Sequence, residues 1–379
     1  MERVAVVAGG GIGGLAVAAG LGARGWRVEV LEKAPAFGEV GAGLSLWPNG
    51  MRALDALGLG DQVRVHALHD IQGGIRDLDG RWLSHTDTAA MEQRYGPVVM
   101  IHRAEFLEIL HRAAPGLRPG TEVTGVDLSG PRVRVEHTGG VTEADLLIGA
   151  DGIRSTVRRA VWPRSPEPRY AGYTAWRLVV DSGPLAAGGE TWGRGERFGI
   201  SPLPGGRAYL FGVAGLAAGG RSTDGELAEL RRRFGGWHDP IPRLLDAASP
   251  GSVLRHDIYE MPALPSFVSG RVALLGDAAH AMTPNLGQGA NQALEDAITL
   301  VTVLDAHPDV PAALVAYDHM RRPRTQMISR RSRRIGALAQ MRALPALRNL
   351  ALRLTPSSSL LNALAPVLDW QVPDAGRAY

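Results

Sequence analysis

The sequence predicts an α/β fold in which a parallel sheet with its helices is interrupted by a β-rich segment. Three observations predict it. A strand–helix–strand pattern occupies the first 32 residues, short alternating segments among glycine and proline run from about 165 to 262, and a buried strand followed by long helices returns after 270. With 379 residues, the chain is long enough for two domains.

The first unit consists of a strand at 3–7, a glycine-rich turn, a helix and a second strand at 27–31. The turn fits the pattern G-x-G-x-x-G of Rossmann-like dinucleotide-binding units. In that pattern Gly9 permits the tight turn, Gly11 lets a pyrophosphate approach the backbone, and Gly14 allows close packing of helix on strand. The sequence therefore predicts a phosphate site at the start of this helix.

A carboxylate follows the second strand. Glu32 comes 18 residues after Gly14, where it can accept a hydrogen bond from a ribose hydroxyl. A solvated acid at a strand end is the alternative interpretation. Together with the glycine pattern, Glu32 predicts that the unit binds a dinucleotide.

The remaining elements follow from periodicity and turn residues. Helices are expected at 48–57, 103–113, 224–234, 287–304 and 310–340, with a helical tail to about 368. Strands are expected as a hairpin at 71–84, within 121–148, and at 173–181, 196–202, 207–213, 253–260 and 271–275.

Composition excludes several classes of protein. There is no cysteine, so disulfides, thiolate nucleophiles and iron–sulfur clusters are ruled out, and no metal site is expected. The chain has 41 Lys+Arg, of which Lys33 is the one lysine, against 38 Asp+Glu. A net charge of +3 is too weak to predict nucleic-acid binding. The arginine excess, including seven arginines between Arg321 and Arg334, is expected mainly on solvated faces or paired with acids.

No apolar run approaches 18 residues, so no membrane span is expected and the expected location is the cytoplasm. A monomer or a homodimer is expected.

Two further segments have the composition of ligand-binding turns. Asp151, in the run Gly-Ala-Asp-Gly-Ile-Arg-Ser at 149–155, follows a buried strand and could bind backbone amides or cap the next helix. At 276–291 a strand leads to Asp277, then a loop with Pro284, then small residues that open a helix. Such a helix start suits a negatively charged group.

These three motifs, in this order, resemble those of the single-component FAD-dependent aromatic hydroxylases, the family of p-hydroxybenzoate and salicylate hydroxylases. The resemblance covers about residues 3–335. Arg103 matches an arginine that these proteins place against FAD, and 41–49 matches a segment that passes near the flavin ring. Three successive glycines at 9–11 depart from the more usual Gly-Ala-Gly. The run at 172–177 looks most like the salicylate, 6-hydroxynicotinate and urate hydroxylase branch.

The resemblance implies a Rossmann-like FAD-binding domain formed by 1–72, 97–164 and 264–340. It also implies a β-rich substrate domain formed by 73–96 and 165–263, and a C-terminal helical tail at 341–379. Noncovalent FAD is expected at Gly9, Gly11, Ile12, Gly14, Glu32, Lys33, Gly43, Arg103, Asp151, Asp277, Gly287, Gly289, Ala290 and Asn291.

Catalytic residues are expected on the substrate side. Pro284 is expected beside the flavin edge, with an ordinary loop proline as the alternative. Arg197 and Tyr209 resemble the arginine and tyrosine of the urate hydroxylase pocket, and a hairpin would bring them together. His280 is expected either near the cofactor or as a structural histidine. Tyr173, Trp176 and Arg177 are expected either to shape the pocket or to pack the sheet.

The resemblance also implies a reaction. NADH or NADPH reduces the FAD as a transient co-substrate, O2 adds at flavin C4a, and the hydroperoxide hydroxylates an aromatic or heteroaromatic small molecule. Because the chain has one dinucleotide fingerprint, the nicotinamide donor is expected to bind without a Rossmann domain of its own. The alternatives are epoxidation or ring oxidation of a polyketide or terpenoid by the same flavin chemistry, a non-oxygenating FAD-dependent reductase, and a regulatory FAD sensor.

Overall fold

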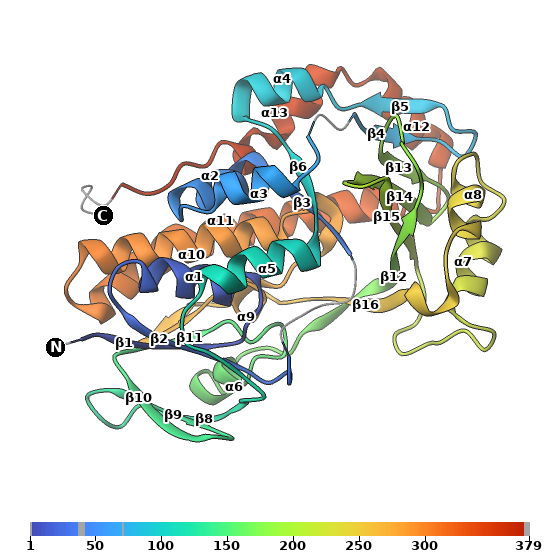
Figure 1. The fold of residues 1–379 in the computed structure, drawn as a ribbon. Helices are drawn as coiled ribbons and strands as arrows, with labels where there is room; N and C mark the ends of the chain where they lie inside the picture. The colour runs from blue at the N-terminus through green and yellow to red at the C-terminus, as the bar shows by residue number, and fades with distance from the viewer. Residues whose placement is uncertain (1, 37–41, 70–71, 375–379) are drawn as a thin grey trace.

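A six-stranded sheet forms the centre of the larger part of the molecule (Figure 1). The computed structural model describes residues 2–36, 42–69 and 72–374. The strand order is β17 (Val268–Ser269), β18 (Val272–Leu274), β11 (Leu146–Gly149), β1 (Val4–Ala8), β2 (Arg27–Glu32) and β7 (Leu117–Pro119). All neighbours are parallel except the edge pair β17–β18. The α/β class predicted from the sequence is confirmed.

Helices and a smaller sheet cover the two faces of this sheet. On one side lie α1 (Ile12–Gly22), α10 (Gly289–Ala306) and α11 (Val310–Ala339), as Figure 1 shows. On the other lie α6 (Thr156–Val161) and the antiparallel strands β8 (Val123–Asp127), β9 (Val133–His137) and β10 (Gly140–Ala144). Every residue of β1 is buried. A strand covered on both faces has a continuous apolar sequence, which is why it was predictable.

A seven-stranded sheet forms the second part. Its order is β16 (Leu254–Glu260), β12 (Arg169–Asp181), β15 (Arg207–Ala214), β14 (Glu196–Leu203), β13 (Gly189–Trp192), β4 (Gly74–Arg76) and β5 (Trp82–His85). The predicted hairpin at 71–84 thus joins strands that come a hundred residues later in the chain. One face packs on α7 (Glu226–Phe234) and α8 (Ile241–Asp246) through Trp176, Phe198 and Leu210. The domain boundaries themselves stay predictions.

The remaining elements lie between the two sheets or beside one of them. They are β3 (Gly43–Leu46) paired with β6 (Val99–His102), α2 (Pro48–Ala56), α3 (Gly60–His66), α4 (Thr88–Tyr95), α5 (Arg103–Ala113), α9 (Asp277–His280) and the 3-10 turns Pro250–Ser252 and Pro284–Leu286. Helices α3, α4, α6 and α8 were not predicted, because each spans fewer than nine residues and shows little periodicity. Within the described ranges, no helix has both the length and the apolar character needed to cross a bilayer.

The C-terminal helices α12 (Pro345–Leu354) and α13 (Ser357–Leu368) run back over the molecule beside α4 and β5 (Figure 1). Arginines fasten them by donating to backbone carbonyls. Arg52 donates to the carbonyls of Leu368 and Trp370, and Arg324 to those of Pro366 and Val367. A further buried arginine, Arg348, donates to the carbonyls of Trp192, Gly193 and Ala339.

These contacts add to the expectation that the arginines lie mainly on solvated faces or pair with acids, because some arginines are buried and bind backbone carbonyls instead. Arg158, Arg197, Arg321 and Arg348 are all buried. The guanidinium group carries five N–H donors in a fixed plane, so one side chain can satisfy several carbonyls at a helix end. Among the seven arginines of α11, four bind carboxylates, as the sequence predicted for a paired face.

Candidate active site

The glycine-rich turn between β1 and α1 has the geometry that the fingerprint predicts. Gly9 has φ +105°, and a Cβ there would lie 2.4 Å from the Ala150 carbonyl oxygen. A Cβ on Gly14 would lie 2.0 Å from the Gly9 carbonyl oxygen. A Cβ on Gly11 would meet nothing within 4 Å, because Gly11 borders an open cavity. No side chain caps the start of α1, so its first N–H groups remain available to an anion.

Glu32 supports this turn from the end of β2. Its two carboxylate oxygens accept hydrogen bonds from the backbone N–H groups of Gly10, at 2.7 Å, and Ala34, at 2.8 Å. Glu32 and Lys33 both line the cavity. A carboxylate has about four acceptor positions, so Glu32 can hold the turn and still accept from a ribose hydroxyl.

Asp151 uses one oxygen for structure and leaves the other without a partner. Oδ2 accepts from the backbone N–H groups of Thr156, at 2.6 Å, and Val157, at 3.1 Å, at the start of α6. Oδ1 is buried, has no hydrogen-bond partner in the structure, and belongs to a residue that lines the cavity. The capping role is therefore present, and the remaining oxygen matches a missing donor such as a cofactor hydroxyl.

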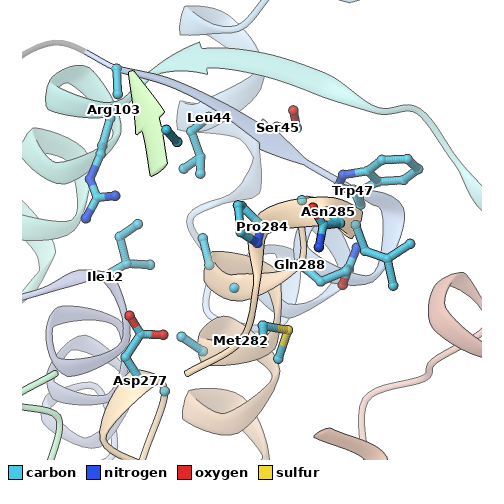
Figure 2. Close-up of a pocket in the computed structure, with 18 of the residues that line it drawn as sticks. Ile12, Leu44, Ser45, Trp47, Arg103, Asp277, Met282, Pro284, Asn285 and Gln288 are labelled. Carbon is cyan, nitrogen blue, oxygen red and sulfur yellow. The ribbon is translucent and has the colours of Figure 1, made fainter. Parts of the chain in front are cut away.

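The segment from β18 to α10 crosses the middle of the cavity. Figure 2 shows the Asp277 carboxylate and the Arg103 guanidinium pointing into the same space from opposite sides, with Pro284 on the loop between the two walls. Surrounding protein raises the pKa of Asp277, and the charges of His280 and Arg103 offset part of that rise. Gly287 has φ +61°, in the left-handed region that favours glycine.

The start of α10 is open to the cavity. Gly289 and Ala290 line it, a Cβ on Gly289 would meet nothing within 4 Å, and no side chain caps the helix. An 18-residue helix that begins at a cavity presents its partial positive charge there. The geometry suits a group that carries negative charge.

Asn291 lies behind this wall. It is fully buried and does not line the cavity. Its Oδ1 accepts from the Trp47 backbone N–H at 2.9 Å, and its Nδ2 donates to the carbonyls of Ser45, at 3.1 Å, and Gly287, at 2.9 Å. The side chain therefore fixes the β3–α2 segment against the start of α10. Gly41, at the start of the matched segment 41–49, lies outside the described residues.

Beneath the cavity, α10 and α11 share a buried network of charges. Arg321 donates to Glu295 and to Asp296, and Asp296 also contacts His280 Nε2 at 2.5 Å. Burial alone would raise the pKa of Asp296, but His280 and Arg321 together lower it to about 2. His280 does not line the main cavity, which favours the structural interpretation of this histidine.

The substrate-side residues lie on one face of the β14–β15 hairpin. Arg197 is opposite Val213 and Tyr209 is opposite Ser201, so the hairpin predicted between the two residues exists. The register separates them by four residues along the strands, or about 13 Å, so they stand at opposite ends of this face. The sequence did not reveal this separation, because it depends on where the turn falls.

Arg197 is buried and held by polar groups. Its guanidinium donates to Glu190 Oε2 at 3.1 Å and to Asn285 Oδ1, while its Nε has no partner in the structure. Asn285 follows Pro284 and donates to Thr283 Oγ1 at 2.9 Å. Arg197 is thereby fixed beside the loop that crosses the cavity.

Tyr209 lies at the other end of the face. A Cβ on Gly43 would be 2.5 Å from the Tyr209 Cβ, so Gly43 is what allows the tyrosine to approach β3. Burial raises the pKa of Tyr209, and Arg177 and Arg103 offset part of that rise. The phenol is therefore neutral at ordinary pH.

Successive side chains of β12 point to opposite faces of the sheet, so the three residues whose role the sequence left open do not all face the cavity. Arg177 lines the cavity. Trp176 faces the other way, packs among the helices α7 and α8, and donates to Glu226 at 2.6 Å. Tyr173 is buried, with its hydroxyl 3.4 Å from Asn285 Oδ1.

One cavity of about 1200 Å³ joins these features. It exceeds the usual 300–1,000 Å³ of a small-molecule site, so it has room for a dinucleotide and a second molecule. Apart from Asn291, every predicted cofactor and catalytic residue lines it. A second cavity of about 590 Å³ adjoins it across Asp277 and Pro284, and Arg154 and Arg177 line both.

Several lining residues were not singled out from the sequence. Glu190 and Asn285 hold Arg197, Trp47 and Gln288 flank the start of α10, and Arg331, Arg334, Ile335 and Leu338 of α11 form a far wall. Asn285 lies inside the 276–291 segment, and the α11 residues recur at helical spacing. Trp47 and Gln288 lie inside the segments 41–49 and 276–291, and only the position of Glu190 depends on strand pairing, which the sequence does not show.

The open glycine turn, the uncapped starts of α1 and α10 and the unpaired oxygen of Asp151 fit FAD, and together they define a flavin-dependent oxidoreductase. The chain belongs to the FAD binding domain family, whose model matches residues 2–332. It is an FAD-dependent monooxygenase of the aromatic hydroxylase type.

Similar proteins agree with this assignment. An aurachin C monooxygenase/isomerase of Stigmatella aurantiaca is 39% identical over 348 residues, covering 88% of this chain and 89% of that protein. A 3-amino-4-hydroxybenzoate 2-monooxygenase of Streptomyces cremeus is 40% identical over 350 residues, covering 88% and 86%. The crystal structure of Klebsiella pneumoniae HpxO with FAD and uric acid superposes with a TM-score of 0.90 at 31% identity, covering 97% of this chain and 96% of that one.

Proposed function

We propose that this enzyme hydroxylates an aromatic or heteroaromatic ring of a small molecule, with a nicotinamide dinucleotide as electron donor and O2 as oxygen source. The observation that carries the proposal is the single cavity that joins the glycine turn to the face bearing Arg197 and Tyr209, across the loop of Pro284. When bound, FAD supplies hydride acceptance and the activation of O2 for oxygen transfer.

The cofactor end would bind FAD chiefly through backbone groups. The N–H groups at the start of α1 face the diphosphate, and Glu32 accepts from a ribose hydroxyl. The start of α10 favours negative charge on the flavin ring system. Arg103, which projects into the same space in Figure 2, adds a positive charge there.

The substrate end would orient the ring by two groups of different kind. Arg197 lines the cavity and is paired with Glu190, but its Nε lacks a protein partner, so the guanidinium can still donate to a carboxylate, phenolate or carbonyl oxygen. Tyr209 lines the cavity, and its phenol can donate a hydrogen bond to a second oxygen. Because about 13 Å separates them along the hairpin, a planar ring fits between them. Pro284 would then lie against the ring beside the flavin.

The second cavity is a suitable entry for the nicotinamide donor. Arg154, Arg177 and Arg255 line it together with Asp257 and Asp277, and within the described ranges no carboxylate lies within ion-pair distance of Arg154 or Arg177. Positive side chains at the boundary of the two cavities would attract the diphosphate of the donor. This arrangement needs no second Rossmann domain.

The test is substrate-dependent oxygenation by the purified enzyme. Phenolic acids, hydroxypyridines and larger polycyclic compounds are screened for stimulated NAD(P)H oxidation under O2 enriched in a heavy oxygen isotope. We expect a yellow protein, stimulation by single-ring compounds, and the isotope in the product. Anaerobic consumption of NAD(P)H with stoichiometric substrate reduction and no isotope would instead identify a reductase, and stimulation by polycyclic compounds alone would favour the polyketide or terpenoid alternative.

A further inference from the structure

Beyond Pro284 the main cavity continues into a space that ring hydroxylation does not require. We call this space the distal branch. Its walls are Arg331, Arg334, Ile335 and Leu338 of α11 and Leu360, Ala363, Leu364 and Val367 of α13. Both sets have the spacing i, i+3, i+4, i+7, which places each on one face of its helix. From Arg331 to Leu338 the branch follows α11 for about 10 Å.

The two helices are joined at this point. Arg331 donates to the Ala363 carbonyl at 2.8 Å, and Leu364 and Val367 pack against Ile328 in one apolar cluster. The branch therefore lies between two helices that are in contact, and it opens to solvent where Arg334, Leu338 and Ala363 are exposed.

Two positive side chains border this otherwise apolar space. Four arginines of α11 pair with carboxylates: Arg321 and Arg324 with Glu295, Arg322 with Asp318, and Arg333 with Glu260. Of the three described α11 arginines without a carboxylate partner, Arg330 faces away from the cavity, whereas Arg331 and Arg334 line it. Arg331, in contrast, bonds only to a carbonyl, and Arg334 has no polar partner among the described residues. None of the described α11 or α13 residues that line the branch is acidic.

We infer that the substrate ring carries an apolar extension that ends in an anionic group, and that the distal branch holds this extension with the anion at Arg331 and Arg334. The inference rests on the proposed function, since it places the ring beside Arg197 and Pro284. Apolar walls favour burial of the chain, and unpaired guanidinium groups favour a terminal carboxylate. The substrate class is thus an amphiphilic phenol or heteroaromatic acid, larger than a single ring.

The test measures binding to the FAD-loaded enzyme by the change in flavin absorbance. The probes are ω-(4-hydroxyphenyl)alkanoic acids of increasing chain length and their methyl esters. We expect the affinity of the acids to rise about two- to fourfold per methylene until the chain spans the branch. For the longer chains, the acid is expected to bind about tenfold more tightly than its ester. Affinity that does not change with chain length would overturn the inference.

Two variants assign these effects to the branch. Arg334→Gln is expected to remove most of the acid-over-ester preference while leaving the ester affinity within twofold. The matched control is Arg330→Gln on the same helix, because Arg330 and Arg334 are both exposed and both lack a carboxylate partner, but only Arg334 lines the cavity. A preference that survives in Arg334→Gln, or that disappears equally in Arg330→Gln, contradicts the proposed anion site.

Leu364→Trp fills the branch. It is expected to abolish the gain from the longer chains while the shortest phenol binds within twofold of the unmodified enzyme. Leu350→Trp is its control, since Leu350 is 51% exposed on α12 and lies outside the cavity. Long acids that still bind as tightly in Leu364→Trp would show that the chain lies elsewhere.

Octanoate distinguishes an amphiphilic substrate from a fatty acid bound on its own. It carries the chain and the carboxylate without the ring, and we expect it to bind at least tenfold more weakly than the phenolic acid of equal length. Equal binding would overturn the inference. If no ring compound stimulates NAD(P)H oxidation, the proposed function itself fails, whereas short phenols that act as well as long acids refute the distal branch alone.

Discussion

The two ends of the main cavity are built from different parts of the chain. At the cofactor end, the wall is backbone: glycines at a turn and the uncapped starts of two helices. At the substrate end, the wall is side chains carried by β12, β14, β15 and the C-terminal helices. A backbone wall leaves little choice of residue, whereas a side-chain wall can change without disturbing the fold. On the proposed function, the first end would therefore fix the chemistry and the second would select the molecule.

The largest effect is expected on the stability of the fold, at the buried Arg321–Glu295–Asp296 network that lies beneath the cavity. In Arg321→Met, Glu295 and Asp296 lose a buried partner that lies 2.7 Å from Asp296 Oδ1, and the free energy of unfolding should fall by about 3–5 kcal/mol. Urea denaturation measures this loss, with Arg330→Met as the exposed control within about 0.5 kcal/mol. A loss below about 1 kcal/mol would mean that the network does not support either end.

The cofactor end is tested by two glycines of the same turn. Gly14→Ala places a methyl group 2.0 Å from a carbonyl oxygen, so it should lower the melting temperature of the FAD-free protein and abolish FAD retention. Gly11→Ala has free space, so it should leave that melting temperature unchanged and weaken FAD binding by tenfold or more. Thermal unfolding without FAD and FAD titration separate the two. Equal melting temperatures for the two variants would contradict the assigned roles.

The substrate end should respond without loss of cofactor. Arg197→Gln removes a charged donor that costs about 2–3 kcal/mol to lose, so kcat/KM should fall about a hundredfold. The dissociation constant of FAD should not change. Arg194→Gln, on the turn between β13 and β14, serves as the control because Arg194 is exposed. If Arg197→Gln released FAD, the separation of the two ends would be wrong.

The smallest expected effect is a loss of folding stability at acid pH. The pKa of Asp296 is about 2 in the folded protein against about 3.8 normally, so its ionised form stabilises the fold by about 2 kcal/mol. A lowered pKa gives stability that is complete above about pH 4 and is lost as the pH falls towards 2. Urea midpoints measured across this range should show the loss in the unmodified protein and much less of it in Asp296→Asn. Identical slopes would contradict the assignment.

The same contrast explains what the sequence could predict. Gly9 and Gly14 were recognisable because the positive φ of Gly9 and the close approach of the Gly9 carbonyl to Gly14 both require glycine. Arg197 and Tyr209 were identified by resemblance, but their separation along the hairpin depends on strand register. Glu190, which holds Arg197, gave no signal, because its position follows from pairing between β13 and β14.

Asn291 illustrates a different limit. It belongs to a motif predicted to bind the cofactor, yet its side-chain amide makes hydrogen bonds to the backbone of Trp47, Ser45 and Gly287 instead. The spacing of Arg331, Ile335 and Leu338 was likewise visible as a helical face. Which element would cover that face depended on tertiary packing that no local pattern encodes.

The arginines that fasten α12 and α13 have a consequence for how the chain tolerates substitution. Arg348 reaches three carbonyls at once, and Arg52 and Arg324 each reach at least two. The ammonium of lysine is a compact point charge without the planar fork that spans such acceptors. General replacement of arginine by lysine would therefore loosen the C-terminal helices before it disturbed either sheet.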